Sequence, residues 1–105
     1  MKITIFYVPF PDQDAALTAI EILLKAKYIA CGNVIVSTSL YHWQGEQSKN
    51  NEHIAILKTL PEKKTILEKR ISEIHTYDVP AILSWEADAN ESYYEWMVET
   101  MKEEP

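Results

Sequence analysis

Three side chains that can do chemistry stand within four residues in the C-terminal half of the chain. They are His75, Tyr77 and Asp78, shortly before Pro80. A histidine at the end of a helix can bind the last carbonyls of that helix, ligate a metal ion or act as a general base. Tyr77 and Asp78 could orient the imidazole of His75. Asp78 could equally bind backbone amides in the turn before Pro80, and Tyr77 could be a half-buried packing residue.

Cys31 is the only cysteine, so the chain cannot form an internal disulfide. A free cysteine most often behaves as a small buried apolar residue. The alternative is a ligand for a soft metal ion, because thiolates select Cu(I) and Zn²⁺. No second cysteine and no nearby histidine lies at ligand spacing from Cys31. A metal site with Cys31 would therefore join distant segments or several subunits.

Several classes of function are disfavoured by what the sequence lacks. It has no glycine-rich phosphate loop and no HExxH motif. It shows no nucleophile, base and orienting group in a recognisable set, so we expect no enzyme activity. The net charge of -6 argues against nucleic acid as a partner. Because no apolar stretch reaches membrane-spanning length and the N-terminal apolar run is too short for a signal peptide, we expect a cytoplasmic protein without a membrane partner.

Apolar periodicity predicts alternating strands and helices. Continuous or alternating runs of β-branched and aromatic residues indicate strands, and apolar residues at i, i+4 and i+7 indicate helices. The predicted strands cover residues 3–8, 31–43, 53–59 and 79–85; the predicted helices cover 12–27, a segment from Pro61 and a segment after Asn90 with Tyr93, Tyr94, Trp96, Met97, Val98 and Met101 on its buried side. Asp12 and Asn90 are the expected N-caps, and Gln44-Gly45 is the expected hairpin turn. The end, Glu103 to Pro105, should fray.

The order β-α-β-β-α-β followed by a helix predicts an α+β ferredoxin-like sandwich in one domain, residues 1–105, with an extra C-terminal helix. The sheet of this fold carries helices on one face only, so its other face must meet water or another subunit. The long hairpin between the second and third strands carries Ile35, Leu40, Tyr41 and Trp43. Such apolar strands are poorly suited to solvent, so we expect self-association. His42 and His53, on the two arms, should not lie opposite each other.

Short motifs in order along the whole chain resemble those of the CutA family of divalent-cation tolerance proteins. They are Pro11-Asp12, Ala30-Cys31-Gly32-Asn33-Val34, Ser39-Leu40-Tyr41-His42-Trp43-Gln44-Gly45, Lys58-Thr59, His75-Thr76-Tyr77-Asp78-Val79-Pro80-Ala81-Ile82 and Tyr93-Tyr94-Glu95-Trp96. The resemblance implies a homotrimer whose hairpins wrap neighbouring subunits. It also implies a response to divalent metal ions, with Cu²⁺ or another divalent cation as the ligand. The trimer architecture is similar to that of the PII signalling proteins, which suggests a small metabolite or a protein partner as the alternative ligand.

The resemblance also assigns expected sites to residues of this chain. His75 and Cys31 are the expected metal ligands; Tyr77, Asp78, Trp96 and Lys58 are the expected lining of a cleft between subunits; Tyr41 and Trp43 are expected at the trimer interface. Some relatives have a copper site with a cysteine near the end of the first strand and a His-His pair. Val8 and Ile74 occupy those positions here, so His75 alone remains of that set.

Overall fold

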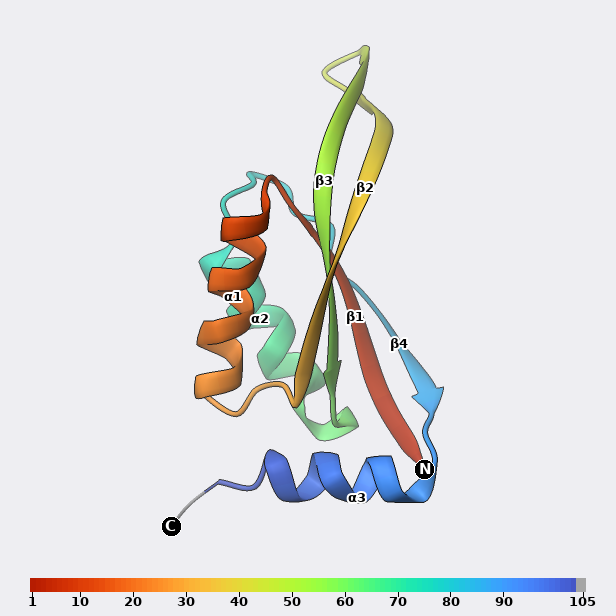
Figure 1. Ribbon diagram of the computed structural model, residues 1–105. Helices are drawn as coiled ribbons and strands as arrows, with labels where there is room; N and C mark the ends of the chain where they lie inside the picture. Colours follow the sequence, from red (N-terminus) through yellow and green to blue (C-terminus); the bar gives the residue numbers. More distant parts are fainter. Residues whose placement is uncertain (104–105) are drawn as a thin grey trace.

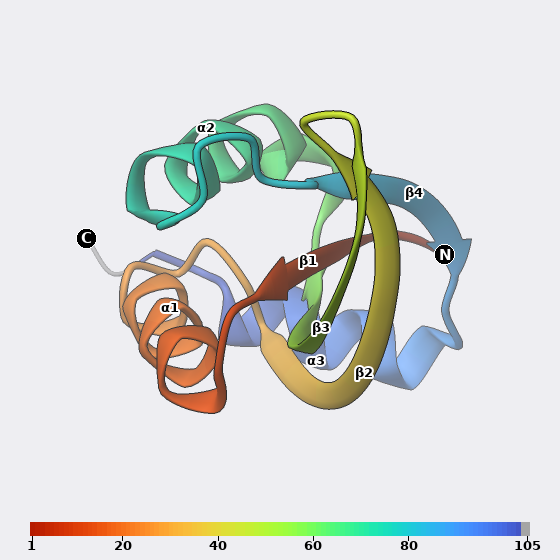
Figure 2. The same cartoon turned by 90° about the horizontal axis from the view of Figure 1, so that it is seen from above.

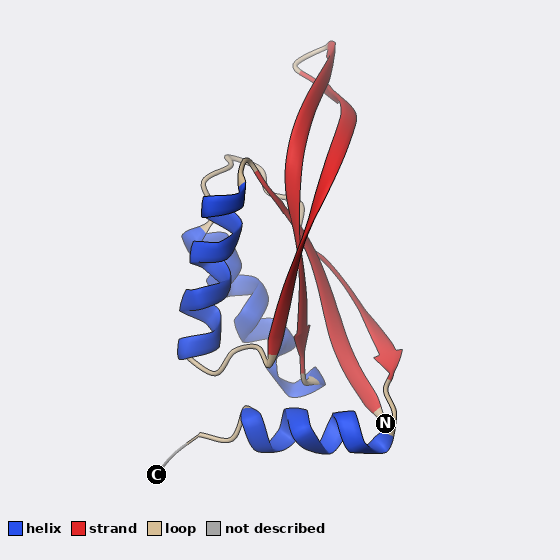
Figure 3. Ribbon diagram, viewed as in Figure 1, coloured by secondary structure: helices blue, strands red, loops and turns tan. Residues whose placement is uncertain are grey.

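The computed structural model describes residues 1–103, so part of the end that was predicted to fray, residues 104 and 105, lies outside the described chain. Figures 1 and 3 show its strands and helices. In chain order they are β1 (Lys2–Phe10), α1 (Gln13–Lys25), β2 (Cys31–Trp43), β3 (Glu46–Thr59), the short 3-10 helix η1 (Pro61–Lys63), α2 (Lys64–Ile74), β4 (Leu83–Asp88) and α3 (Glu91–Thr100).

The four strands form one antiparallel sheet in the order β2-β3-β1-β4. Helices α1 and α2 pack side by side on one face of this sheet, and α3 crosses its end near the N-terminus (Figures 1 and 2). This is the ferredoxin-like arrangement with an added C-terminal helix, so the predicted fold class is confirmed. Below, the face opposite α1 and α2 is called the open face. No helix in residues 1–103 is long and apolar enough to span a bilayer.

The main core lies between the sheet and the pair α1 and α2. Every second residue of β1 and β3 points toward these helices, as the period of a strand requires. The buried residues of this core include Phe6, Val8, Phe10, Ala55 and Leu57 from the sheet and Ala16, Ile20, Leu23, Leu67 and Ile71 from the helices. The side chain of Asp12 accepts a hydrogen bond from the amide of Ala15 at 2.8 Å, so its predicted role as the N-cap of α1 is confirmed.

The hairpin of β2 and β3 is longer on its return arm than the sequence predicted. We expected the return strand to begin at His53, but β3 begins at Glu46. The polar residues 46–52 pair in full with 37–43 of β2, because the ladder uses backbone groups and does not require apolar side chains. The predicted turn is confirmed: Gln44 and Gly45 have φ of 52° and 81°.

The last strand begins four residues later than predicted and ends at Asp88. The pairing of β1 with β4 stops at Tyr7 opposite Leu83. In the same register, Val8 would lie opposite Ile82, Pro9 opposite Ala81 and Phe10 opposite Pro80. Proline has no N–H for the ladder, so residues 79–82 form a loop instead.

The C-terminal helix α3 differs in part from its prediction. Met97 and Met101 are buried in a second small core with Ile3, as expected, whereas Trp96 and Val98 are exposed. Asn90 is the N-cap residue by position, but its side chain makes no capping hydrogen bond. It donates to the hydroxyl of Ser92 instead.

Candidate functional site

A cavity of about 570 Å³ opens where the loop between α2 and β4 meets the hairpin of β2 and β3. This cavity is called the Glu52 cleft below. It is lined by Pro9 of β1, Ser39, Tyr41 and Trp43 of β2, Glu52 of β3, and Thr76, Tyr77, Asp78, Val79 and Ala81 of the loop. By register, Pro9 and Glu52 lie on the open face, so the cleft belongs to that face. Its size is typical of a site for a small organic ligand.

His75 anchors the loop to the end of β1. Its Nε2–H donates to the carbonyl of Pro9 at 2.7 Å, and its Nδ1 accepts from the backbone amide of Tyr77 at 3.0 Å. These two contacts require the neutral tautomer with the proton on Nε2. The ring also stacks on Phe10, with centroids 4.4 Å apart and planes 12° apart. These contacts fix the start of the loop at the end of β1. The loop then leads from α2, on the helix side of the sheet, to Tyr77, which contacts Glu52 on the open face.

Glu52 and Tyr77 form the polar centre of the cleft. The Tyr77 hydroxyl donates to Oε2 of Glu52 at 2.8 Å. Glu52 is 9% exposed, which makes it the only buried ionisable side chain in residues 1–103. Burial raises the pKa of the Tyr77 phenol well above its usual value, and the hydrogen bond to Glu52 and the charge of that carboxylate raise it further. Tyr77 therefore keeps its proton and remains a donor to Glu52 at neutral pH.

Comparison with known proteins identifies the family. Residues 4–100 match the sequence model of the family described as "CutA1 divalent ion tolerance protein". The chain belongs to the CutA1 family. The divalent-cation tolerance protein CutA of Pyrococcus horikoshii is 40% identical over 99 residues, which cover 93% of this chain and 97% of that protein. The CutA of Thermococcus kodakarensis is 36% identical over 102 residues, covering 96% of this chain and 98% of the relative.

Solved structures agree with this assignment. The crystal structure of CutA1 from Pyrococcus horikoshii superimposes with a TM-score of 0.92 at 40% identity, and the match covers 95% of this chain and 99% of the other. CutA1 from Ehrlichia chaffeensis gives a TM-score of 0.92 at 33% identity, covering 95% of each chain. Membership of the CutA1 family, expected from the sequence motifs, is therefore confirmed.

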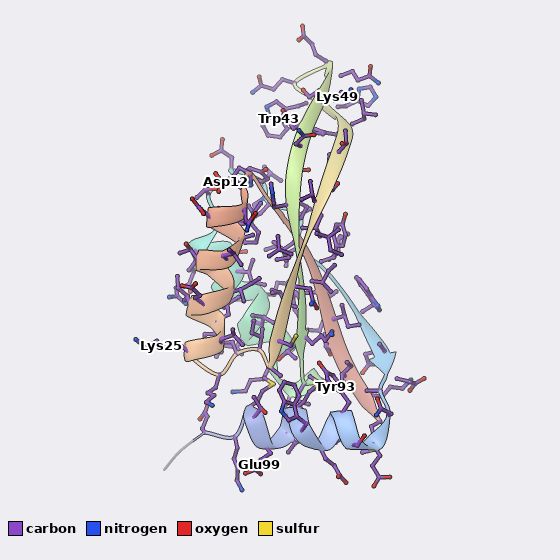
Figure 4. The ribbon with its side chains drawn as sticks, in the orientation of Figure 1. Asp12, Lys25, Trp43, Lys49, Tyr93 and Glu99 are labelled. Atoms are coloured by element: carbon purple, nitrogen blue, oxygen red, sulfur yellow. The ribbon has the colours of Figure 1, made fainter. Side chains whose placement is uncertain are left out.

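The residues expected in one cleft fall into two groups within the CutA1 chain. Tyr77 and Asp78 line the Glu52 cleft, together with Tyr41 and Trp43, which we expected at a trimer interface. Lys58 and Trp96 lie at the other end of the sheet. Figure 4 shows this separation through Trp43, near the hairpin tip, and Tyr93, which belongs to α3.

The second group is built around Tyr93 of α3. The Nζ of Lys58 lies 5.5 Å from the centroid of the Tyr93 ring, and the Tyr93 and Trp96 rings are 5.4 Å apart. Cys31 is directly opposite Lys58 in the ladder of β2 and β3, so it belongs to the same end. One chain thus presents an acidic cleft at one end of the open face and a lysine with aromatic rings at the other.

A single chain does not offer a donor set that fits a divalent metal ion at the expected ligands. Both ring nitrogens of His75 are already hydrogen-bonded, so neither has a free lone pair for a metal. Cys31 lies opposite Lys58, far along the sheet from the Pro9 carbonyl that holds His75. Within residues 1–103, no group of three His, Cys, Asp or Glu side chains is placed to hold an ion.

Sequence reasoning missed Glu52, the residue at the centre of the cleft. Glu52 stands in the polar stretch before the apolar part of β3, and glutamates in such stretches are usually exposed to solvent. The alternation of the strand contained a usable signal: Glu52 shares a face with Ile54 and Ile56. A carboxylate in line with apolar residues is a candidate for burial, and hence for function.

Proposed function

We propose that this CutA1 protein is a homotrimer that binds a small ligand in the Glu52 cleft as part of a response to divalent cations. The observation that carries this proposal is the cleft itself, which combines a buried carboxylate, a bonded phenol and aromatic rings that are exposed in the single chain, on a sheet face that the chain's own helices leave uncovered. In this proposal the protein works as a ligand-binding module of the PII type and not as an enzyme. The cytoplasmic location remains our proposal; some matched relatives are named as chloroplastic.

The exposed apolar residues of the open face support self-association. Ile35 of β2 and Leu83 of β4 are each 54% exposed, and Trp85 of β4 is 47% exposed. By register, all three side chains lie on the open face. A sheet face with such residues is covered in stable proteins, and a second and third copy of the chain are the partners that the family resemblance suggests.

Sedimentation equilibrium tests the assembly. We expect a mass close to three times the chain mass of 12.1 kDa. Ile35→Glu places a charge on the open face and should give monomers. Ile66→Glu is the matched control, because Ile66 is 47% exposed on α2, away from this face, and the same chemical change there should leave the trimer intact. A wild-type monomer, or a trimer that survives Ile35→Glu, contradicts the proposed assembly.

Ligand binding is tested by thermal unfolding of the assembled protein against a broad panel of small metabolites. A ligand that binds only the folded state raises the unfolding temperature in proportion to the logarithm of its concentration. We expect at least one class of compound to do so, and the shift should be lost when Thr76→Trp fills the cleft. If no compound in the panel raises the unfolding temperature of a well-folded trimer, the proposed small-molecule function is wrong.

Direct binding of Cu²⁺ or another divalent cation is the second candidate function. The names of the relatives, divalent-cation tolerance proteins, favour it, as does Cys31, which is partly exposed and lies opposite Lys58. Because Cys31 and His75 do not meet within one chain, this candidate requires donors from different copies. Calorimetry with Cu²⁺, Zn²⁺ and Co²⁺ tests it: stoichiometric heat that disappears in Cys31→Ala supports it, and the absence of heat with a folded trimer excludes it.

A further inference from the structure

Glu52 is a buried carboxylate without a counter-charge from the described part of its own chain. It is 91% buried, and the Tyr77 hydroxyl, its hydrogen-bond partner, is neutral. No lysine, arginine or histidine nitrogen in residues 1–103 lies within 4.0 Å of its oxygens, since all ion pairs of this part of the chain involve other residues. A buried charge without a partner is costly, and one hydrogen bond from a neutral group compensates only part of that cost.

The lysines of β3 do not supply the missing charge within the chain. Lys49 has the opposite strand parity, so its side chain leaves the sheet on the other face. Lys58 shares the face of Glu52 but follows it by six residues, about 20 Å along the strand. Its ammonium group lies over the ring of Tyr93.

The lining of the Glu52 cleft has the chemistry that recognises a cation. It contains a second carboxylate, Asp78, and the rings of Tyr41, Trp43 and Tyr77, and it contains no basic side chain. Aromatic faces attract ammonium groups, and an ammonium group beside a carboxylate forms strong charge-assisted hydrogen bonds. Within this lining an anionic metabolite would meet two carboxylates and no positive side chain, so the residues that one chain supplies disfavour anionic ligands.

We propose that the Glu52 cleft binds a small organic cation, with its ammonium group beside the Glu52 carboxylate and its apolar body against Tyr41 and Trp43. The inference rests on the proposed ligand-binding function and names the class of ligand. The free Oε1 of Glu52 takes the ammonium group, because Oε2 already accepts from Tyr77. The volume of about 570 Å³ exceeds what a bare inorganic ion fills and suits a compound with an apolar body.

Calorimetry on the assembled protein tests the proposal with three organic cations and with neutral and anionic compounds that match one of them in shape. Benzylamine, choline and spermidine serve as cations, with benzyl alcohol and benzoate as the neutral and anionic counterparts of benzylamine. We expect at least one cation to bind, and to bind about tenfold or more tightly than benzyl alcohol or benzoate. Glu52→Gln should weaken that binding by about 10- to 100-fold, the range for one buried hydrogen bond to a charge.

Two further variants separate this effect from changes in folding or overall charge. Glu46→Gln removes the same charge from the exposed start of β3 and should change the affinity less than about twofold. Glu52→Gln itself should keep or raise the unfolding temperature of the ligand-free trimer, because the amide oxygen still accepts from Tyr77 and the unpaired charge is gone.

Several results of these measurements would contradict the proposed binding of an organic cation. Benzoate binding as tightly as benzylamine, or full affinity for the cation in Glu52→Gln, overturns the organic-cation proposal and leaves ligand binding intact. If none of the three cations binds, the proposal is wrong; if the wider metabolite panel is silent as well, the proposed function fails with it. Strong coupling between Glu52→Gln and Lys58→Gln in the stability of the trimer also overturns it, since Lys58 of another copy would then be the counter-charge.

Discussion

Replacement of His75 should destabilise the protein through its loop contacts, whether or not any metal ion is present. His75→Ala removes the hydrogen bonds at 2.7 Å to Pro9 and at 3.0 Å from Tyr77, and the stacking on Phe10. Each hydrogen bond contributes about 0.5–1.5 kcal/mol, and the ring pair adds a similar amount. The expected loss is therefore about 2–4 kcal/mol per chain in the free energy of unfolding.

Urea unfolding measures this loss, with all variants at one protein concentration because the stability of an oligomer depends on concentration. The buffer contains a chelator, so that no metal ion contributes. His75→Phe keeps a ring over Phe10 but loses both hydrogen bonds, and it should lie between His75→Ala and wild type. His42→Ala, at an exposed hairpin position, is the matched control and should be neutral. The reasoning is refuted if His75→Ala costs no more than His42→Ala, or if its cost appears only when Cu²⁺ is added.

Three other predictions follow from single contacts. Because the pKa of the Tyr77 phenol is raised in the folded state, the unfolded chain loses this proton first, so stability should fall as the pH rises above about 10; pH titration of urea unfolding should show a smaller fall in Tyr77→Phe. Asp12→Ala removes the N-cap of α1 and should cost about 1 kcal/mol in the same assay, and a neutral result would contradict the cap. Gly32→Ala would place a Cβ 2.9 Å from Cγ2 of Ile20, and should cost about 1–3 kcal/mol by overpacking; wild-type stability would show that Ile20 moves freely.

The elements with a clear apolar period were predictable, and the errors fall where backbone rules decide. The strand at residues 3–8 and the helix after Asp12 were found because each buries one face in the core. The apolar run of residues 79–82 looked like a strand, yet it cannot continue the ladder because prolines stand at Pro9 and Pro80. The apolar period of a single segment carries no information about prolines in the strand that it would pair with.

The composition of the cleft was predictable only in part, for a similar reason. Tyr77 and Asp78 were singled out because several reactive side chains occur together at the end of an element. Glu52 was not, because its significance depends on a contact with Tyr77, 25 residues away in the chain. Trp96 and Lys58 were expected with Tyr77 in a cleft between subunits; within one chain, the pairing of the strands sets them at the other end of the open face, so that expectation stays a prediction about the assembly.

The contrast between His75 and Glu52 shows which property makes a side chain available for binding. His75 has the more versatile chemistry, but its donor and its acceptor are both used within the chain, and its ring face is used by Phe10. The Glu52 carboxylate can only accept hydrogen bonds. Its Oε2 accepts from Tyr77, and its Oε1 can still accept from a ligand. A buried group with spare hydrogen-bonding capacity and spare charge gains free energy from a ligand, whereas a satisfied group must first lose a contact. In this CutA1 chain the histidine therefore positions the cleft, and the carboxylate is the group with capacity left for a ligand.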